Sequence, residues 1–168
     1  MHPAALDWIA RHATDEEVRV LDVGGRDING TARDLFPNAT EYVVVDLVKH
    51  PSVDLTADVL DLKPTGRAKL SVGQFDVIVY AEVAEHSPDW VDHLDHLTDL
   101  LADDGRCIIT AAGPTRTPHS GIDGGAVRDG EHYANLTRDE LDAALYGIGD
   151  RYVIDESGHD LRAVFWKG

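Results

Sequence analysis

Hydrophobic residues occur along the chain in short continuous runs, and between the runs they recur at every third or fourth position. The runs are rich in valine and isoleucine, which is typical of strands in a parallel sheet that is covered on both faces. They predict strands at residues 18–23, 42–46, 53–55, 75–80, 106–110, 152–155 and 161–166.

The periodic segments between these runs have the pattern of amphipathic helices. They are residues 4–12, 30–36, 90–101 and a segment that begins after Thr137. One face of the helix at 90–101 would hold Val91, Leu94, Leu97, Leu100 and Leu101. Thr137 and Glu140 have the spacing of a capping box, which fixes the start of the last helix. Residues 61–71 contain a proline and a glycine and predict either a helix or a loop.

The order of these elements alternates strand and helix, which predicts an α/β fold with a Rossmann-like, doubly wound sheet. Most of the strands should be parallel. The last two strands have no helix between them and are joined by a turn at residues 157–159, so the final strand should be antiparallel. We expect a single domain over residues 1–168, a length that suffices to bury a core.

Composition excludes several classes of protein. No apolar run reaches about 18 residues, so no membrane span is expected, and the first residues lack the pattern of a signal peptide. Cys107 is the single cysteine, which excludes an internal disulfide and favours a reducing, cytoplasmic location. The net charge is -16, so nucleic acid is not an expected partner. A monomer and a homodimer both stay open.

Polar residues and glycines follow several predicted strands at their carboxyl ends. They are Asp22-Val23-Gly24-Gly25, Asp46, Asp58 and Tyr80-Ala81-Glu82. In doubly wound sheets, ligands bind beyond these ends, near the point where the strand order reverses. Adjacent glycines let a ligand approach the backbone at free N–H groups. Asp46 can accept hydrogen bonds from both hydroxyls of a ribose, and Asp58 can accept one from an adenine amino group.

At these residues the chain resembles the class I S-adenosylmethionine-dependent methyltransferases. Residues 20–27 resemble their first motif, residues 42–47 the second, residues 57–60 the adenine-contacting segment and residues 75–86 the fourth-strand motif. The resemblance implies a seven-stranded sheet and S-adenosylmethionine as cofactor. It implies cofactor contacts from Asp22, Gly24, Gly25, Arg26, Asp46, Leu47, Asp58, Val59 and Ala81.

The glycine turn departs from the usual pattern of that family. Arg26 and Ile28 stand where the later glycines of the first motif are expected, and Asn29-Gly30 follows them. A branch of the family with a Gly-Ser-Arg-Asp-like turn is similar. A nicotinamide-dependent oxidoreductase has the same kind of sheet, but its Gly-x-Gly-x-x-Gly spacing is not matched here. The acid Asp22 before the glycines also favours the methyl donor, because it can accept from that donor's amino group.

The segment Glu82-Val83-Ala84-Glu85-His86 carries the most specific candidate chemistry. Its two carboxylates and its imidazole would share one face of a helical turn and can hold a divalent metal such as Mg²⁺, which lowers the pKa of an acceptor hydroxyl. The segment is similar to one that binds metal in ubiquinone-pathway O-methyltransferases and in 2′-O-methyltransferases of small-RNA 3′ ends. Metal-free relatives also carry a Glu-His pair after this strand, so both readings stay open.

In the RNA-end family a further histidine precedes a helix that begins with threonine, as His132 does here. The resemblance implies catalytic roles for Glu82, His86 and His132. The metal ligands that it implies are Glu82, Glu85, His86 and His132.

A long connection rich in glycine and proline runs over residues 113–135, and we expect it to cover the strand ends as a lid over the acceptor. His119 and His132 flank this connection and are candidates for a base near neutral pH. His93 and His96 lie on the predicted helix before it, where surface positions are expected.

The expected function is transfer of a methyl group from S-adenosylmethionine to a small-molecule acceptor, at a hydroxyl oxygen. Because the sulfonium already activates the methyl group, the protein has mainly to align the acceptor and to exclude water. No Pro-Pro-aromatic segment follows the fourth strand, so methylation of DNA bases is not expected. The alternatives are a catalytically inactive regulatory module that binds S-adenosylmethionine, and metal-dependent 2′-O-methylation of an RNA end.

Overall fold

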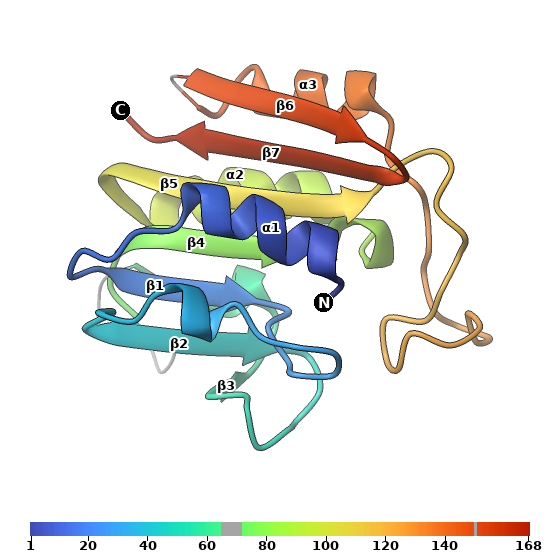
Figure 1. Cartoon of the computed structure of the whole chain (residues 1–168), viewed down its shortest axis with the longest axis horizontal. Helices are drawn as coiled ribbons and strands as arrows, with labels where there is room; N and C mark the ends of the chain where they lie inside the picture. The colour runs from blue at the N-terminus through green and yellow to red at the C-terminus, as the bar shows by residue number, and fades with distance from the viewer. Residues whose placement is uncertain (65–71, 150) are drawn as a thin grey trace.

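The computed structural model describes residues 1–64, 72–149 and 151–168. The first strands along the chain are β1 (Arg19–Val23), β2 (Glu41–Asp46) and β3 (Leu55–Thr56). They are followed by β4 (Phe75–Ala81), β5 (Leu101–Ala112), β6 (Arg151–Ser157) and β7 (Asp160–Trp166). Together they form a seven-stranded sheet in the order β3-β2-β1-β4-β5-β7-β6, as Figure 1 shows.

The direction of the strands confirms the predicted sheet. β1 pairs in parallel with β2 and β4, and β4 pairs in parallel with β5. β7 lies between β5 and β6 and is antiparallel to both. The chain runs outward from β1 to β3 and then returns to β4 on the other side of β1. The strand order therefore reverses between β1 and β4, which is where ligands bind in such sheets.

Helices cover both faces of this sheet (Figure 1). The helix α1 (Pro3–His12) lies on one face, and α2 (Trp90–Leu100) and α3 (Arg138–Leu145) lie on the other. Successive side chains of a strand point to opposite faces, so each strand contributes to two separate hydrophobic clusters. On the α1 face, Trp8 packs with Val20 and Val77. On the α2 face, Leu97 packs with Leu21 and Ile78.

The predicted helix at residues 30–36 is wrong. The structure has only the short 3-10 turn η1 (Arg33–Leu35) there. Gly30 has a φ of 113°, outside the helical region, and Phe36 has a φ of -126°. The residue before a proline is disfavoured in the helical conformation, so Pro37 ends the segment after one turn. Two further 3-10 turns are η2 (Val59–Asp61) and η3 (Ala84–His86).

Other elements differ from the prediction mainly in their bounds. The predicted strand at 53–55 is found as the two-residue strand β3, which begins at Leu55 and ends one residue later than predicted. The predicted strand at 106–110 extends at both ends, because Leu101 pairs with Phe75 of β4 and β7 pairs as far as Ala112. The capping box of Thr137 and Glu140 is confirmed at the start of α3. The prediction for 61–71 falls mostly on residues 65–71, which lie outside the described part.

The segment between β5 and α3 runs beyond the carboxyl ends of the parallel strands (Figure 1). We call residues 113–136 the lid. In the described part of the chain, no helix combines the length and the apolar character needed to cross a membrane.

Candidate active site

The turn after β1 brings main chain, not side chains, to the ends of the strands. Gly24 has a φ of 70°, a left-handed conformation that favours glycine, and its N–H donates to the carbonyl of Val45 at 2.8 Å. A Cβ atom on Gly25 would lie 2.3 Å from the carboxyl carbon of Asp22. Both positions therefore require glycine, which lets a ligand lie directly against the backbone.

Asp22 lies beneath this turn. Its carboxylate is fully buried and accepts a hydrogen bond from the Tyr42 hydroxyl at 2.7 Å. Burial raises the pKa of Asp22 to about 6, although the Tyr42 hydrogen bond and the charge of Arg33 act in the opposite direction. Asp22 is not among the described residues that line the two cavities of this site. It supports the turn from below, and its contact with the amino group of the cofactor stays a prediction.

The first cavity, which we call the β2-side cavity, has a volume of about 570 Å³ and lies beyond the ends of β1 and β2. The predicted cofactor residues that line it are Gly24, Arg26, Asp46, Leu47, Asp58 and Val59. Asp46 accepts a hydrogen bond from the Val48 N–H at 2.7 Å, and Asp58 accepts one from the Leu60 N–H at 3.0 Å. These short bonds to neighbouring backbone fix both carboxylates at the cavity wall.

His93 also lines the β2-side cavity, so its predicted surface position is wrong. The residue is only 7% exposed, and its Nδ1 lies 2.9 Å from the Tyr80 hydroxyl. Its Nε2 lies 3.9 Å from Asp58 Oδ1. The predicted inner face of the helix contained Val91 instead, which is 49% exposed. The signal in the sequence was the spacing of His93 to the buried leucines of α2, four and seven residues later.

The second cavity, the lid-side cavity, has a volume of about 800 Å³. Its walls are residues 1–3, the glycine turn, the end of β4 and much of the lid, and they include the predicted Gly25 and Ala81. The residues that border both cavities are Gly24, Arg26, Asp46, Glu82, His86 and Gly121. Arg26 also ties the turn to the lid, because its Nη2 donates to the carbonyls of Gly121 and Ile122 at 3.1 and 3.0 Å.

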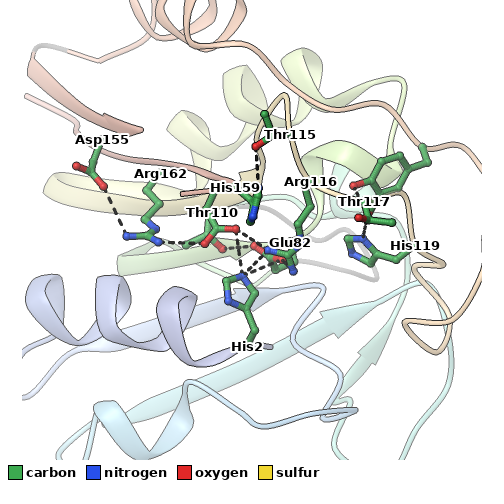
Figure 2. A network of polar contacts seen from close by, with 12 residues as sticks. His2, Glu82, Thr110, Thr115, Arg116, Thr117, His119, Asp155, His159 and Arg162 are labelled. Atoms are coloured by element: carbon green, nitrogen blue, oxygen red, sulfur yellow. Dashed lines mark hydrogen bonds and ion pairs between the residues drawn. The ribbon is translucent and has the colours of Figure 1, made fainter. Parts of the chain in front are cut away.

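Glu82 joins a network of ion pairs between the N-terminal residues, the lid and β7, which Figure 2 shows. Its φ of 58° is a strained conformation for a residue other than glycine. The carboxylate accepts a hydrogen bond from Thr110 Oγ1 at 2.9 Å and lies 3.4 Å from His2 Nε2 and 3.6 Å from Arg116 Nη2. Burial opposes ionisation, but His2, Thr110 and Arg116 outweigh it and hold the pKa of Glu82 below its ordinary value. Glu82 is therefore an ionised anchor and a poor base.

Glu85, His86 and His119 form a separate cluster, in which one ligand atom from each lies within 4.8 Å of the others. Glu85 is fully buried, and neither of its carboxylate oxygens has a hydrogen-bond partner among the described residues. Burial, and secondly the charge of Glu82, raise the pKa of Glu85 to about 8. The His86 ring contacts the rings of His119 and Tyr133, with centroids 5.0 and 5.4 Å apart. Burial lowers the pKa of His86.

The structure brings together only part of the predicted metal set. Glu85 and His86 adjoin each other, but the carboxylate of Glu82 belongs to the ion-pair network. His132 lines the β2-side cavity instead. At this end of the lid, Tyr133 is the residue whose ring contacts His86. His119, from the other end of the lid, occupies the place expected for His132.

Residues 1–149 match the model of a family described as a methyltransferase domain. Comparison with curated protein sequences finds no match. Among solved structures, the 1,6-didemethyltoxoflavin-N1-methyltransferase of Burkholderia thailandensis, with 1,6-didemethyltoxoflavin and S-adenosylhomocysteine bound, is 19% identical, with a TM-score of 0.67 over 99% of this chain and 77% of that one.

Two other solved structures with this fold act, by their names, at other atoms. The CurJ carbon methyltransferase is 18% identical, with a TM-score of 0.61 over 90% of this chain and 49% of that one. An O-methyltransferase family protein from Burkholderia thailandensis is 13% identical, with a TM-score of 0.66 over 98% of this chain and 55% of that one. The fold is therefore common to methyl transfer at nitrogen, carbon and oxygen.

Proposed function

Because this chain belongs to the methyltransferase-domain family, we propose that it transfers the methyl group of S-adenosylmethionine to a hydroxyl oxygen of a small-molecule acceptor. The observation that carries the proposal is the pair of cavities with a common border at the glycine turn. A methyl donor and an acceptor must be held in line for the transfer, and two adjoining cavities allow this. Residues 1–168 would act as a single domain.

The β2-side cavity suits the nucleoside of S-adenosylmethionine. The Asp46 carboxylate can accept hydrogen bonds from the ribose hydroxyls, and Asp58 can accept one from the adenine amino group. Leu47 and Val59 add apolar surface for the purine ring.

The methionine part would lie at the border of the two cavities. There the glycine turn leaves the backbone uncovered, and Arg26 supplies a cation. Arg26 Nε is buried without a hydrogen bond among the described residues and lies 3.8 Å from Asp46 Oδ2, in an ion pair. Nη2 already donates to the carbonyls of Gly121 and Ile122, so Arg26 would hold the methionine carboxylate through its remaining N–H groups, chiefly those of Nη1. This role accounts for an arginine where the usual motif has a glycine.

When bound, S-adenosylmethionine supplies a methyl group that its sulfonium has already activated. The acceptor hydroxyl loses its proton as its oxygen bonds to the methyl carbon and the carbon–sulfur bond breaks, which leaves S-adenosylhomocysteine. His86 and His119 line the lid-side cavity, where the acceptor would lie. The lowered pKa of His86 keeps its imidazole neutral near pH 7, so it can accept the proton. Glu82 stays ionised and anchors His2 and Arg116 at the cavity wall.

Isothermal titration calorimetry with S-adenosylmethionine and S-adenosylhomocysteine tests the cofactor. We expect saturable binding, which Asp46→Ala weakens by roughly tenfold or more because a charged acceptor for the ribose is lost. Asp61→Ala is the matched control, since Asp61 is exposed and outside the described walls of both cavities. No binding of either ligand at millimolar concentration would overturn the proposal.

Mass spectrometry of reactions with a panel of acceptors tests the acceptor class. The panel should hold hydroxylated small molecules, amines, carbon acids and a short RNA with a free 3′ end. We expect a gain of one methyl group on a hydroxylated small molecule. Methylation of amines, carbon acids or RNA alone would contradict the proposed acceptor, and binding without any product would favour a regulatory module.

We also propose that Glu85, His86 and His119 bind a divalent cation; in the cation-bound protein His86 is a ligand and not the base, and the cation would lower the pKa of the acceptor hydroxyl instead. The supporting observation is the buried Glu85 carboxylate, which has no hydrogen-bond partner in the described part of the chain and faces two imidazoles. Imidazole ligands suit Mn²⁺, Co²⁺ or Zn²⁺, whereas Mg²⁺ prefers oxygen. Thermal unfolding should therefore shift upward with Mn²⁺ or Zn²⁺ more than with Mg²⁺. Glu85→Gln should abolish the shift, and an equal shift in both proteins would refute the site.

A further inference from the structure

Tyr80, His93 and Asp58 form a row of side chains that leads from the core to the wall of the β2-side cavity. The Tyr80 hydroxyl lies 2.9 Å from His93 Nδ1, and His93 Nε2 lies 3.9 Å from Asp58 Oδ1. The rings of Tyr80 and His93 meet edge to face, with an angle of 87° between their planes. Tyr80 is fully buried and His93 is nearly so. The packing therefore fixes the orientation of the imidazole.

The Tyr80 hydroxyl determines which nitrogen of His93 carries the hydrogen. Among the described residues, His93 Nδ1 is the one hydrogen-bond partner of this hydroxyl. If the hydroxyl accepted a hydrogen bond here, its own proton would be buried without an acceptor, which is costly. Tyr80 therefore donates and Nδ1 accepts. Because burial lowers the pKa of His93, the imidazole is neutral, and its hydrogen lies on Nε2.

The cavity wall thus presents a donor beside an acceptor, the Nε2–H of His93 next to the carboxylate of Asp58. Adenine has the complementary pair on its edge, since its amino group donates and the adjacent ring nitrogen accepts. In a 6-oxopurine a carbonyl replaces the amino group, and the adjacent N1 carries a hydrogen. If the ribose stays in place, the carbonyl of that base would face the Asp58 carboxylate, and its N1–H would face the Nε2–H of His93. Neither hydrogen bond could then form.

We propose that His93 is a specificity-determining residue, whose Nε2–H binds a ring nitrogen of the cofactor's adenine while Asp58 accepts from the amino group. The inference rests on the proposed function, because it assumes an adenosyl ligand in the β2-side cavity. Tyr80 is a positioning residue, which acts through His93. Neither residue is among the described walls of the lid-side cavity, so neither is expected to take part in the proton transfer.

Calorimetric titration with two ligands tests the role of His93. They are S-adenosylhomocysteine and S-inosylhomocysteine, the deaminated analogue with a 6-oxopurine. The unaltered protein should bind the adenosyl ligand more tightly. His93→Leu removes the donor and should weaken binding of S-adenosylhomocysteine roughly tenfold, with a smaller effect on the inosyl ligand. His93→Gln keeps an N–H near the position of Nε2 and should restore most of the preference.

Tyr80→Phe releases Nδ1 and should reduce the preference for the adenosyl ligand by roughly threefold. His96→Gln is the matched control, because His96 lies on the same helix but contacts the Leu62 carbonyl at 3.0 Å, away from the described cavity walls. Thermal unfolding of each variant checks that it folds.

An equal loss for both ligands in His93→Leu, or no loss, would overturn the inference while the proposed function stands. No binding of either ligand to the unaltered protein would overturn both. A preference that His93→Gln fails to restore would also count against hydrogen bonding by this residue.

Discussion

The two cavities share a border, but they are built from different kinds of structure. The β2-side cavity is formed by strand ends held in register, as in the pairing of Val23 with Val45. The lid-side cavity is formed by the N-terminal residues and the lid, which is attached through contacts such as the Ala134 N–H to the Glu85 carbonyl at 2.8 Å. A rigid scaffold can hold a ligand common to a family, and loops can vary with the acceptor. Changes on the β2 side should therefore alter cofactor affinity, and changes on the lid side should alter turnover.

Gly25→Ala should have the largest effect, because it damages the turn on which both cavities depend. The new Cβ would lie 2.3 Å from the Asp22 carboxyl carbon, so the turn must shift. We expect binding of S-adenosylhomocysteine to weaken by roughly a hundredfold and the free energy of unfolding to fall by about 1–3 kcal/mol. Calorimetry and urea unfolding measure the two. Gly147→Ala, where no atom lies within 4 Å of the added carbon, should change neither.

His119→Ala should separate the two regions by function. We expect kcat to fall by roughly a hundredfold, because His119 packs against the proposed base His86 in the lid-side cavity and its loss leaves that imidazole misplaced, while the Kd of S-adenosylhomocysteine stays the same. His132→Ala is the matched change at the other end of the lid and should leave kcat nearly unaltered. The opposite pattern would return the catalytic role to His132, and a loss of cofactor affinity in His119→Ala would remove the distinction between the cavities.

The dependence of the free energy of unfolding on pH should distinguish two buried acids, Asp22 beneath the glycine turn and Glu85 beneath the lid. The pKa of Asp22 is raised from 3.8 to about 6, and that of Glu85 from 4.5 to about 8, chiefly by burial in both cases. Each acid holds its proton more tightly in the folded protein, so stability falls as pH rises through the interval between its two pKa values.

Above pH 6 the loss should therefore come mainly from Glu85. Urea unfolding in the presence of a chelator should show the protein losing on the order of 2 kcal/mol between pH 6 and pH 8. Glu85→Gln should flatten that interval. Asp22→Asn, which keeps an acceptor for Tyr42, should only reduce the slope between about pH 4 and pH 6, because Glu85 also contributes there, and the double variant should flatten both intervals. A flat profile for the unaltered protein above pH 6 would show that Glu85 is already ionised.

The β2 side was also the more predictable of the two from sequence. Valine-rich runs predict the strands, and acids directly after these runs mark the strand ends. The sheet and the positions of Asp46 and Asp58 can therefore be predicted from the order of hydrophobic and acidic residues. No α-helix forms at residues 30–36, because Gly30 has a positive φ and Pro37 leaves room for only one turn before it. The spacing of His93 to the buried leucines indicates that it faces the core, but its partner Tyr80 follows only from the packing of α2 against β4.

The lid side could not be predicted to the same depth. Spacing placed Glu85 and His86 together, since they are neighbours on one turn. The spacing does not show whether His119 or His132 lies beside them. The path of the lid depends on contacts such as that between the rings of Tyr133 and His86, and no periodic pattern in the sequence predicts such contacts. The partners of Glu82 come from residues 2, 110 and 116, which no local pattern connects.

Leu47→Ala should have the smallest effect and gives the finest test of the contrast. Leu47 is 72% exposed, so its truncation should change the free energy of unfolding by less than about 0.5 kcal/mol. It lines the β2-side cavity, however, and loss of apolar contact with the purine should weaken binding of S-adenosylhomocysteine roughly threefold. Val153→Ala, at a 52% exposed position on β6, should change neither quantity. Weaker binding at unchanged stability would show that the Leu47 side chain contacts the ligand and not the protein core. Unchanged binding would exclude Leu47 from the cofactor site and leave Val59 as the apolar contact there.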